Sequence, residues 1–121
     1  MRKGILAALV IAGVAFAVLS AMWWQAPAPV DAPATVAITL REMAFSPGRI
    51  EVPAGAVTVR IINAGSLEHD FSIDALQISP NVRPGSTVEY SFVAAPGEYP
   101  VYCSLPGHRE AGMAGTLVVV P

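Results

Sequence analysis

One cysteine, two histidines and one methionine of this chain could together hold a metal ion. Cys103 is the only cysteine among 121 residues, and one of the two histidines, His108, follows it after four intervening residues. Met113 follows His108 after another four, and the second histidine, His69, lies 34 residues before Cys103. Thiolate, imidazole and thioether groups are the donors that select transition metals in proteins. The spacing therefore raises the question of whether the fold brings these four side chains together.

This donor set fits the chemistry of a blue-copper electron-transfer site. Such a site holds copper with two imidazoles and a thiolate in a trigonal plane and a weakly bound thioether on the axis. The thiolate suits Cu(I), the imidazoles suit both oxidation states, and the long axial bond favours neither. Taken singly, each residue has another interpretation, since an inward cysteine or methionine is often a core residue. The joint spacing favours the copper site over those separate interpretations.

The elements that must position these residues are β-strands. Apolar and polar residues alternate with the two-residue period of a half-buried strand. Strands are predicted at 36–40, 49–52, 57–61, 69–73, 88–92, 99–103 and 116–120. Turn signals rich in proline, glycine and asparagine separate them at 46–48, 53–55, 63–65, 83–85 and 95–97. The sequence therefore predicts an all-β fold, a Greek-key sandwich of seven to eight strands.

The predicted strands explain how the four residues could meet. His69 opens one strand and Cys103 ends another, and these points lie at the same end of a sandwich when the strands are antiparallel neighbours. Cys103 points inward on the alternation, and His108 and Met113 follow in the next loop. The aromatic residues of the domain are expected to be core residues without a chemical role: Phe71, Tyr90, Phe92 and Tyr99.

The N-terminus predicts export. Arg2 and Lys3 precede 21 uncharged residues, Gly4 to Trp24, which as a helix would span roughly 31 Å, enough to cross a bilayer. We expect residues 1–24 to remain as a membrane anchor; the alternative is a signal peptide cleaved after a small-x-small site at 26–28 or 32–34. The exported part would face the periplasm or the extracytoplasmic side of the cytoplasmic membrane.

The remaining chain divides into a linker and one domain. Residues 25–34 contain several prolines, which block helix and ladder pairing and favour an extended spacer. Residues 35–121 form a single domain with five arginines, no lysine and eight acidic residues, a net charge of −3. This charge gives no support for nucleic-acid binding. One cysteine cannot form an internal disulfide, so in an exported domain it is buried, paired with another chain or a metal ligand.

The sequence resembles the cupredoxins, the small blue copper proteins. The resemblance rests on Cys103-x4-His108-x4-Met113 and on His69 after Asn63-x-Gly65, and the segments 96–99 and 115–120 are also similar to their last strands. It covers residues 35–120, and the ligand-loop spacing is most like that of auracyanin and rusticyanin. The resemblance implies a type 1 copper site with His69, Cys103 and His108 equatorial and Met113 axial.

The resemblance also implies a role. It indicates an electron carrier, not an enzyme, that shuttles single electrons between redox partners such as cytochromes or membrane electron-transfer complexes. The ring of His108 would be the electron port, within an apolar patch that includes Leu105 and Pro106. We expect a monomer tethered to the membrane by its N-terminal helix.

One position departs from the family pattern. Many cupredoxins carry Asn or Ser directly after the first histidine, where its side chain ties the ligand loops together, and this chain has Asp70. The Asp70 N–H could still donate to the sulfur of Cys103. Its carboxylate either favours Cu(II) and depresses the reduction potential or merely accepts loop N–H bonds. Asn63 is a further candidate for supporting the ligands.

Other functions fit the residues of this chain less well. A multicopper enzyme needs further histidines, and the dinuclear copper site of an oxidase subunit is excluded by the single cysteine. Zinc hydrolase chemistry fits the methionine poorly, and a cysteine hydrolase built on Cys103 and His108 leaves His69 and Met113 unexplained. The main alternative is a periplasmic copper carrier or chaperone without an electron-transfer role.

Overall fold

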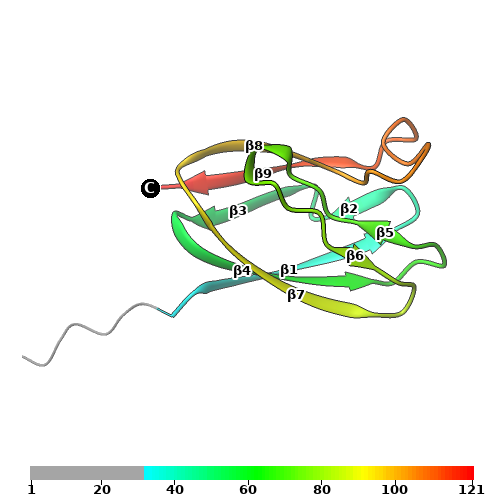
Figure 1. The fold of residues 1–121 in the computed structure, drawn as a ribbon, viewed down its shortest axis with the longest axis horizontal. Coiled ribbons are helices and arrows are strands. Elements are labelled where there is room, and N and C mark those ends of the chain that lie inside the picture. The colour runs from blue at the N-terminus through cyan, green and yellow to red at the C-terminus, as the bar shows by residue number, and fades with distance from the viewer. Residues whose placement is uncertain (1–31) are drawn as a thin grey trace, which may run out of the picture. The chain divides into compact units, whose positions relative to one another are not determined.

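Two β-sheets face one another in residues 32–121, the part of the chain that the computed structural model describes (Figure 1). One sheet has the strand order β2-β1-β4-β7 and the other has the order β3-β9-β8, and a two-stranded sheet, β5-β6, lies beside them. The strands are β1 (Ala34–Arg41), β2 (Ala44–Ser46), β3 (Arg49–Pro53), β4 (Gly55–Asn63), β5 (His69–Asp70), β6 (Asn81–Val82), β7 (Thr87–Ala94), β8 (Gly97–Tyr102) and β9 (Ala114–Val120). A 3-10 turn, η1 (Asp74–Leu76), is the helical element of this range.

The all-β prediction is confirmed for the described residues, and every predicted strand has a counterpart. The described range holds nine strands where seven or eight were expected. The two additional strands, β2 and β6, have three and two residues, too short to display an alternating pattern. The strand predicted at 69–73 is also shorter than expected, because β5 ends at Asp70 and the chain continues through isolated bridges at Ser72 and Ile73.

The core forms where the alternating residues of both sheets turn inward. On β4, Val57, Val59 and Ile61 are fully buried, while the residues between them are partly or fully exposed. Ile50 on β3 and Leu117 on β9 are buried in the same cluster. Burying side chains of this size contributes about 1.5–3 kcal/mol each. The two-residue period therefore gives each sheet one apolar face, which the other sheet covers.

The aromatic residues occupy the core to different degrees. Phe71 is fully buried and meets Phe45 edge to face with 5.9 Å between the ring centroids. Tyr90, Phe92 and Tyr99 are partly buried and pack against the core cluster. Phe71 is therefore the core residue that we expected, and the other three aromatic residues fit that expectation in part.

The predicted metal-ligating segments lie at one end of the sandwich. A backbone bridge joins Ser72, just after β5, to Tyr102 at the end of β8: Ser72 N–H donates to Tyr102 O at 2.9 Å and Tyr102 N–H donates back at 3.1 Å. His69 and Cys103 are consequently held next to one another. Figure 1 shows β5 and the loop between β8 and β9 together at the end opposite the C-terminus.

The predicted N-terminal anchor and residues 25–31 of the predicted linker lie outside the described residues. Within residues 32–121, no helix is both long and apolar enough to cross a bilayer. The proposed division at 24 and 34 therefore stays a prediction from sequence.

Candidate metal centre

The donor atoms of His69, Cys103 and His108 converge on one point. One nitrogen from each imidazole and the sulfur of Cys103 all lie within 4.8 Å of one another. The two Nδ1 atoms are 3.2 Å apart, and the sulfur lies 3.5 Å from Nδ1 of His108. Three electron-rich atoms directed at the same small volume are the arrangement that a cation would stabilise.

The two histidines differ in their access to solvent. His69 and Cys103 have no exposed surface, whereas His108 is half-buried. The imidazole rings lie 5.1 Å apart at an interplanar angle of 63°. One side of the donor cluster is therefore closed by the protein, and the other reaches toward the surface through His108.

Met113 is tied to both neighbouring donor residues through its backbone. Its N–H donates to the carbonyl of His108 at 3.0 Å, and its carbonyl accepts the N–H of Cys103 at 3.1 Å. Met113 is also fully buried. The fold thus brings all four residues that the spacing singled out to the same end of the molecule.

The loop that carries three of these residues is held by its own hydrogen bonds. His108 N–H donates to Leu105 O at 3.1 Å, and Gly112 N–H donates to Arg109 O at 3.0 Å. Gly107 and Gly112 have φ angles of 82° and 104°, in the left-handed region that glycine adopts without strain. Tight turns at these glycines fold the loop into a compact unit, so that His108 and Met113 come back toward Cys103.

The Asp70 carboxylate links the two segments that carry His69 and Cys103. Its Oδ1 accepts the Ser104 N–H at 2.8 Å and the Ser72 hydroxyl at 2.9 Å, and its Oδ2 accepts the Ser104 hydroxyl. The Asp70 N–H donates to the Cys103 sulfur at 3.5 Å, the bond expected from sequence. Asp70 thus provides the loop connection expected of Asn or Ser at this position, with Ser72 and Ser104 as partners that the sequence analysis missed.

Asn63 hydrogen-bonds to the loop before His69 and to none of the donor side chains. Its Nδ2 donates to Leu67 O at 2.8 Å and to Val82 O at 2.9 Å, while its Oδ1 accepts the Gly65 N–H at 2.9 Å. These bonds shape the loop that leads to His69 and attach it to β6. Asn63 therefore supports the loop that positions the histidine.

Glu42 is a neighbour of the centre that sequence reasoning did not find. Its Oε1 accepts the N–H groups of Ser66 and Leu67 at 2.7 and 2.8 Å and lies 3.5 Å from Nε2 of His69. The hydrogen bond from Leu67, foremost, holds the pKa of the Glu42 carboxyl below its ordinary value. Glu42 sits in the turn after β1, far from His69 in sequence, and no spacing pattern connects the two.

The environment of Cys103 keeps the free thiol protonated. Burial raises the pKa of the Cys103 thiol above its ordinary value, and the hydrogen bond from the Asp70 N–H only partly opposes this effect. A bound cation reverses this preference, since metal ligation deprotonates a coordinating thiol. The buried thiol and the converging imidazoles therefore fit a soft metal such as copper.

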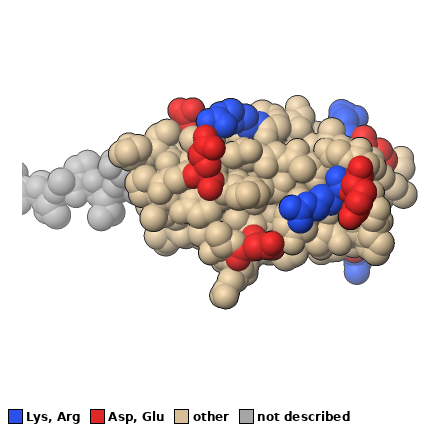
Figure 2. Space-filling view, turned by 90° about the horizontal axis from the view of Figure 1, so that it is seen from above, with Lys and Arg blue, Asp and Glu red and all other residues tan. Residues whose placement is uncertain are grey.

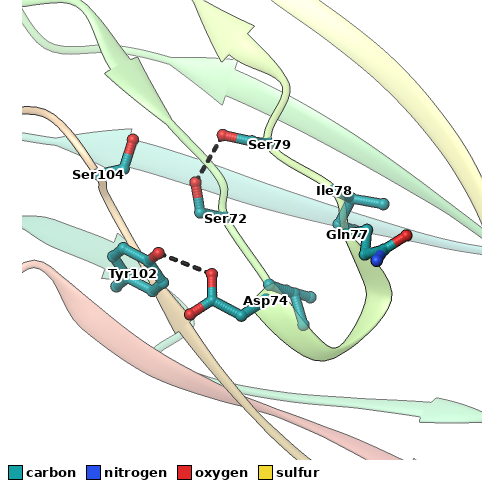
Figure 3. A pocket seen from close by; sticks show the side chains of 8 residues that line it. Ser72, Asp74, Gln77, Ile78, Ser79, Tyr102 and Ser104 are labelled. Carbon is teal, nitrogen blue, oxygen red and sulfur yellow. Dashed lines mark hydrogen bonds between the residues drawn. The ribbon is translucent and has the colours of Figure 1, made fainter.

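A hollow of about 340 Å³ with a mixed polar and apolar lining adjoins the centre (Figure 3). Hydroxyl groups that line it are paired: Tyr102 donates to Asp74 at 2.7 Å, and Ser72 and Ser79 lie 2.8 Å apart. The guanidinium of Arg109 lies over the ring of Tyr102, 4.2 Å from its centroid. These contacts hold the segment after β5 and the ligand loop against the end of β8.

Comparison with known proteins agrees with this fold and centre. Residues 13–119 match the family model described as the cupredoxin-like domain. The chain belongs to this cupredoxin-like family, as the resemblance in its sequence suggested.

Among individual proteins, the chain is similar both to an oxidase subunit and to a plastocyanin. It is 40% identical over 91 residues to cytochrome c oxidase subunit 2 of Thermus thermophilus, an alignment covering 70% of this chain and 64% of that protein. It is 37% identical over 90 residues to the chloroplastic plastocyanin of Fritillaria agrestis, covering 64% of this chain and 52% of the plastocyanin. The chain therefore spans less than two thirds of the length of either relative.

Solved structures of auracyanins share the fold. Auracyanin A, a "blue" copper protein from Chloroflexus aurantiacus, superimposes with a TM-score of 0.63 at 27% identity, covering 74% of this chain and all of that one. An auracyanin from Roseiflexus castenholzii superimposes with a TM-score of 0.65 at 24% identity, covering 75% of this chain and all of that one. The latter likeness supports the fold alone.

Proposed function

We propose that this protein is an exported one-electron carrier with a mononuclear type 1 copper site. The observation that carries the proposal is the convergence of three donor atoms, from His69, Cys103 and His108, within 4.8 Å of one another. Met113, buried and bound through its backbone to Cys103 and His108, is the proposed axial ligand. A copper ion held by this set would alternate between Cu(I) and Cu(II) without forming or breaking bonds to a substrate.

The protein's contribution is to keep the donors in place. The bridge between Ser72 and Tyr102 fixes the two strand segments, and the Asp70 carboxylate ties the His69 segment to Ser104. A rigid donor set keeps the rearrangement on electron transfer small. Because both imidazoles and the thiol are taken up as proposed copper ligands, the proposed role is outer-sphere electron transfer and not enzymatic turnover.

The likeness to cytochrome c oxidase subunit 2 supports a common ancestry and similar redox partners, but not the same number of copper ions. A dinuclear copper site of the oxidase-subunit kind needs a second cysteine, and Cys103 is the only one. We therefore propose a single copper ion. Relatives among oxidase subunits and plastocyanin support redox partners such as cytochromes or membrane electron-transfer complexes.

The proposed location and assembly follow from the N-terminal sequence. Residues 1–24 would anchor the protein, or direct its export, and 25–34 would tether the domain at the extracytoplasmic face of the membrane. We propose a monomer whose half-buried His108, flanked by Leu105 and Pro106, exchanges electrons in brief contacts.

A copper carrier is the second candidate, and metal exchange separates it from the shuttle. The full burial of His69 and Cys103 favours a shuttle, since a carrier must release its ion to a partner. We would load the full-length protein with copper and measure, in parallel, metal transfer to a competing Cu(I) chelator and electron exchange with cytochrome c. The shuttle predicts electron exchange that is much faster than metal transfer. Metal transfer as fast as electron exchange would support the carrier.

A further inference from the structure

The imidazole of His69 has two nitrogens in unlike surroundings. Its Nδ1 faces the donor cluster, 3.2 Å from Nδ1 of His108. Its Nε2 points the other way and is the one buried side-chain nitrogen or oxygen of the described residues without a hydrogen-bond partner. A buried N–H without a partner costs free energy, so an acceptor beside Nε2 would stabilise the tautomer that carries its proton on this nitrogen.

The Glu42 carboxylate lies beside this nitrogen, with its Oε1 3.5 Å from Nε2. We propose that Glu42 is a positioning residue for His69. Its carboxylate accepts the Nε2–H of the imidazole, which leaves Nδ1 without a proton and directed at Cys103 and His108. Histidine ligands commonly donate their second N–H to a carboxylate, which fixes the tautomer and raises the basicity of the ligating nitrogen. The inference rests on the proposed function where copper is involved, but the tautomer itself belongs to the metal-free protein.

The carboxylate is not free to move away from His69. The pairing of Arg41 with Ala44 leaves Glu42 and Met43 as the two residues of a tight turn. Met43 adopts a φ of 32° while its side chain packs against the core, which anchors the turn. The N–H groups of Ser66 and Leu67 then hold Oε1 from the opposite loop.

Gly65 leaves the space that this carboxylate occupies. A Cβ atom added at Gly65 would lie 2.9 Å from Cδ of Glu42 and closer still to Oε1. An alanine here would therefore push the carboxylate aside without altering its charge. The Gly65→Ala substitution thus tests position separately from chemistry.

Four variants of the full-length protein separate the possible contributions. Glu42→Ala removes acceptor and charge, Glu42→Gln keeps a neutral acceptor oxygen, and Gly65→Ala displaces the intact carboxylate. Glu51→Gln, at an exposed position on β3, is the control for loss of one negative charge. Circular dichroism of each metal-free variant verifies that it is folded.

The first readout is the histidine ring nitrogen spectrum of 15N-labelled, metal-free protein. We expect His69 to carry its proton on Nε2 in the wild type, in Glu42→Gln and in Glu51→Gln. In Glu42→Ala and Gly65→Ala we expect a mixture of tautomers. A wild-type proton on Nδ1, or an Nε2–H form that survives in both Glu42→Ala and Gly65→Ala, would overturn the proposal.

The second readout is copper. Loss of such an outer partner weakens metal binding about 10–100-fold, and the more positive Cu(II) loses more than Cu(I). For Glu42→Ala and Gly65→Ala we expect Cu(II) affinity to fall at least about tenfold; if Cu(I) affinity is unchanged, the potential rises by about 59 mV per tenfold loss. Glu51→Gln should match the wild type. The positioning role would be contradicted if Glu42→Ala and Gly65→Ala had the same copper affinities and potentials as Glu51→Gln.

Failure of the proposed function would look different from failure of this inference. If the tautomer changes as expected but no blue copper spectrum forms in the wild type, the proposed function fails and the assignment of Glu42 stands.

Discussion

At the scale of single residues, Asp70 joins the two ligand segments by means of a buried charge. Asp70 is 4% exposed, and its side chain accepts hydrogen bonds from Ser72 and Ser104, while its N–H donates to the Cys103 sulfur. The structure bears out the interpretation that Asp70 accepts a loop N–H bond, which comes from Ser104. The effect of its carboxylate on the copper ion depends on charge and stays a prediction.

Replacing Asp70 by asparagine tests that prediction. The amide oxygen that Asp70→Asn introduces can still accept the Ser104 N–H, so the loop connection is retained while the negative charge is lost. Because the carboxylate favours the more positive Cu(II), we expect Asp70→Asn to raise the reduction potential in a potentiometric titration. Asp74→Asn, which removes a more distant carboxylate beside Tyr102, should change the potential less. An unchanged or lower potential in Asp70→Asn would argue against an electrostatic role.

The raised pKa of Cys103 predicts how copper binding depends on pH. Burial raises the pKa of the thiol above its ordinary value of about 9, so the metal-free protein binds a proton there at neutral pH. Copper takes the thiolate and therefore displaces that proton. Between about pH 7 and 9, below the raised pKa of the thiol, copper affinity should therefore rise about tenfold per pH unit. Competition titrations with a chelator would measure this slope, and Cys103→Ser should lack it; a flat wild-type profile would contradict the assignment of the thiolate.

At the scale of elements, the chemical types of the site were readable from the sequence, but its supporting contacts were not. The spacing from Cys103 to Met113 is local, because one strand end and one loop supply three donors. The partners Glu42 and Ser104 act through the meeting of loops that are distant in sequence. Side chains that meet only after folding leave no periodic trace in the chain. The short strands β2 and β6 escaped prediction for a related reason, since their pairing depends on neighbours more than on their own pattern.

The approach of β9 to the turn before β3 yields a prediction about packing. Gly115, at the start of β9, lies so close to Gly48 that an added Cβ would be 2.5 Å from the Gly48 carbonyl oxygen. The same carbonyl accepts the N–H of Thr116, so the backbone cannot retreat without losing this bond. We expect Gly115→Ala to lower the free energy of unfolding by about 1–3 kcal/mol in denaturant titrations of the metal-free protein.

The facing glycine is the matched control for this substitution. An added Cβ at Gly48 would meet only the Phe45 carbonyl oxygen, at an ordinary 3.8 Å. Gly48→Ala should therefore leave stability near that of the wild type. Equal stabilities for the two variants would mean that β9 can shift away from the turn.

At the scale of the whole molecule, the surface carries charges of both signs. On the face in Figure 2, acidic and basic side chains are interspersed among a majority of uncharged residues. The exposed pair Arg49 and Glu98, 2.8 Å apart, is one example. Such a surface offers little long-range steering, so contact with redox partners would depend on local surfaces near His108.

A charge placed beside His108 should slow partner exchange without disturbing copper. Leu105 is half-buried in the ligand loop, and Leu105→Glu would put a carboxylate into the proposed contact surface. We expect electron exchange with cytochrome c to slow about tenfold or more in stopped-flow measurements, with an unchanged copper spectrum. The control is Val93→Glu, which places the same charge on an exposed apolar residue away from the ligand loops. Val93 is 76% exposed on β7 and pairs with Ala56, near the start of β4 and far along that strand from Asn63. Equal rates in Leu105→Glu and Val93→Glu would remove the electron port from this face.

The proposed function depends on a bond between copper and the Cys103 thiolate, and the spectrum of the copper-loaded protein reports this bond. We would load the full-length protein with Cu(II) and record visible absorption and electron paramagnetic resonance before and after ascorbate, with Cys103→Ser as the control. We expect an intense blue band that ascorbate bleaches, a narrow copper hyperfine splitting, and neither feature in Cys103→Ser. A pale, ordinary Cu(II) spectrum in the wild type would show that Cys103 does not bind the metal, and the electron-carrier function would be contradicted.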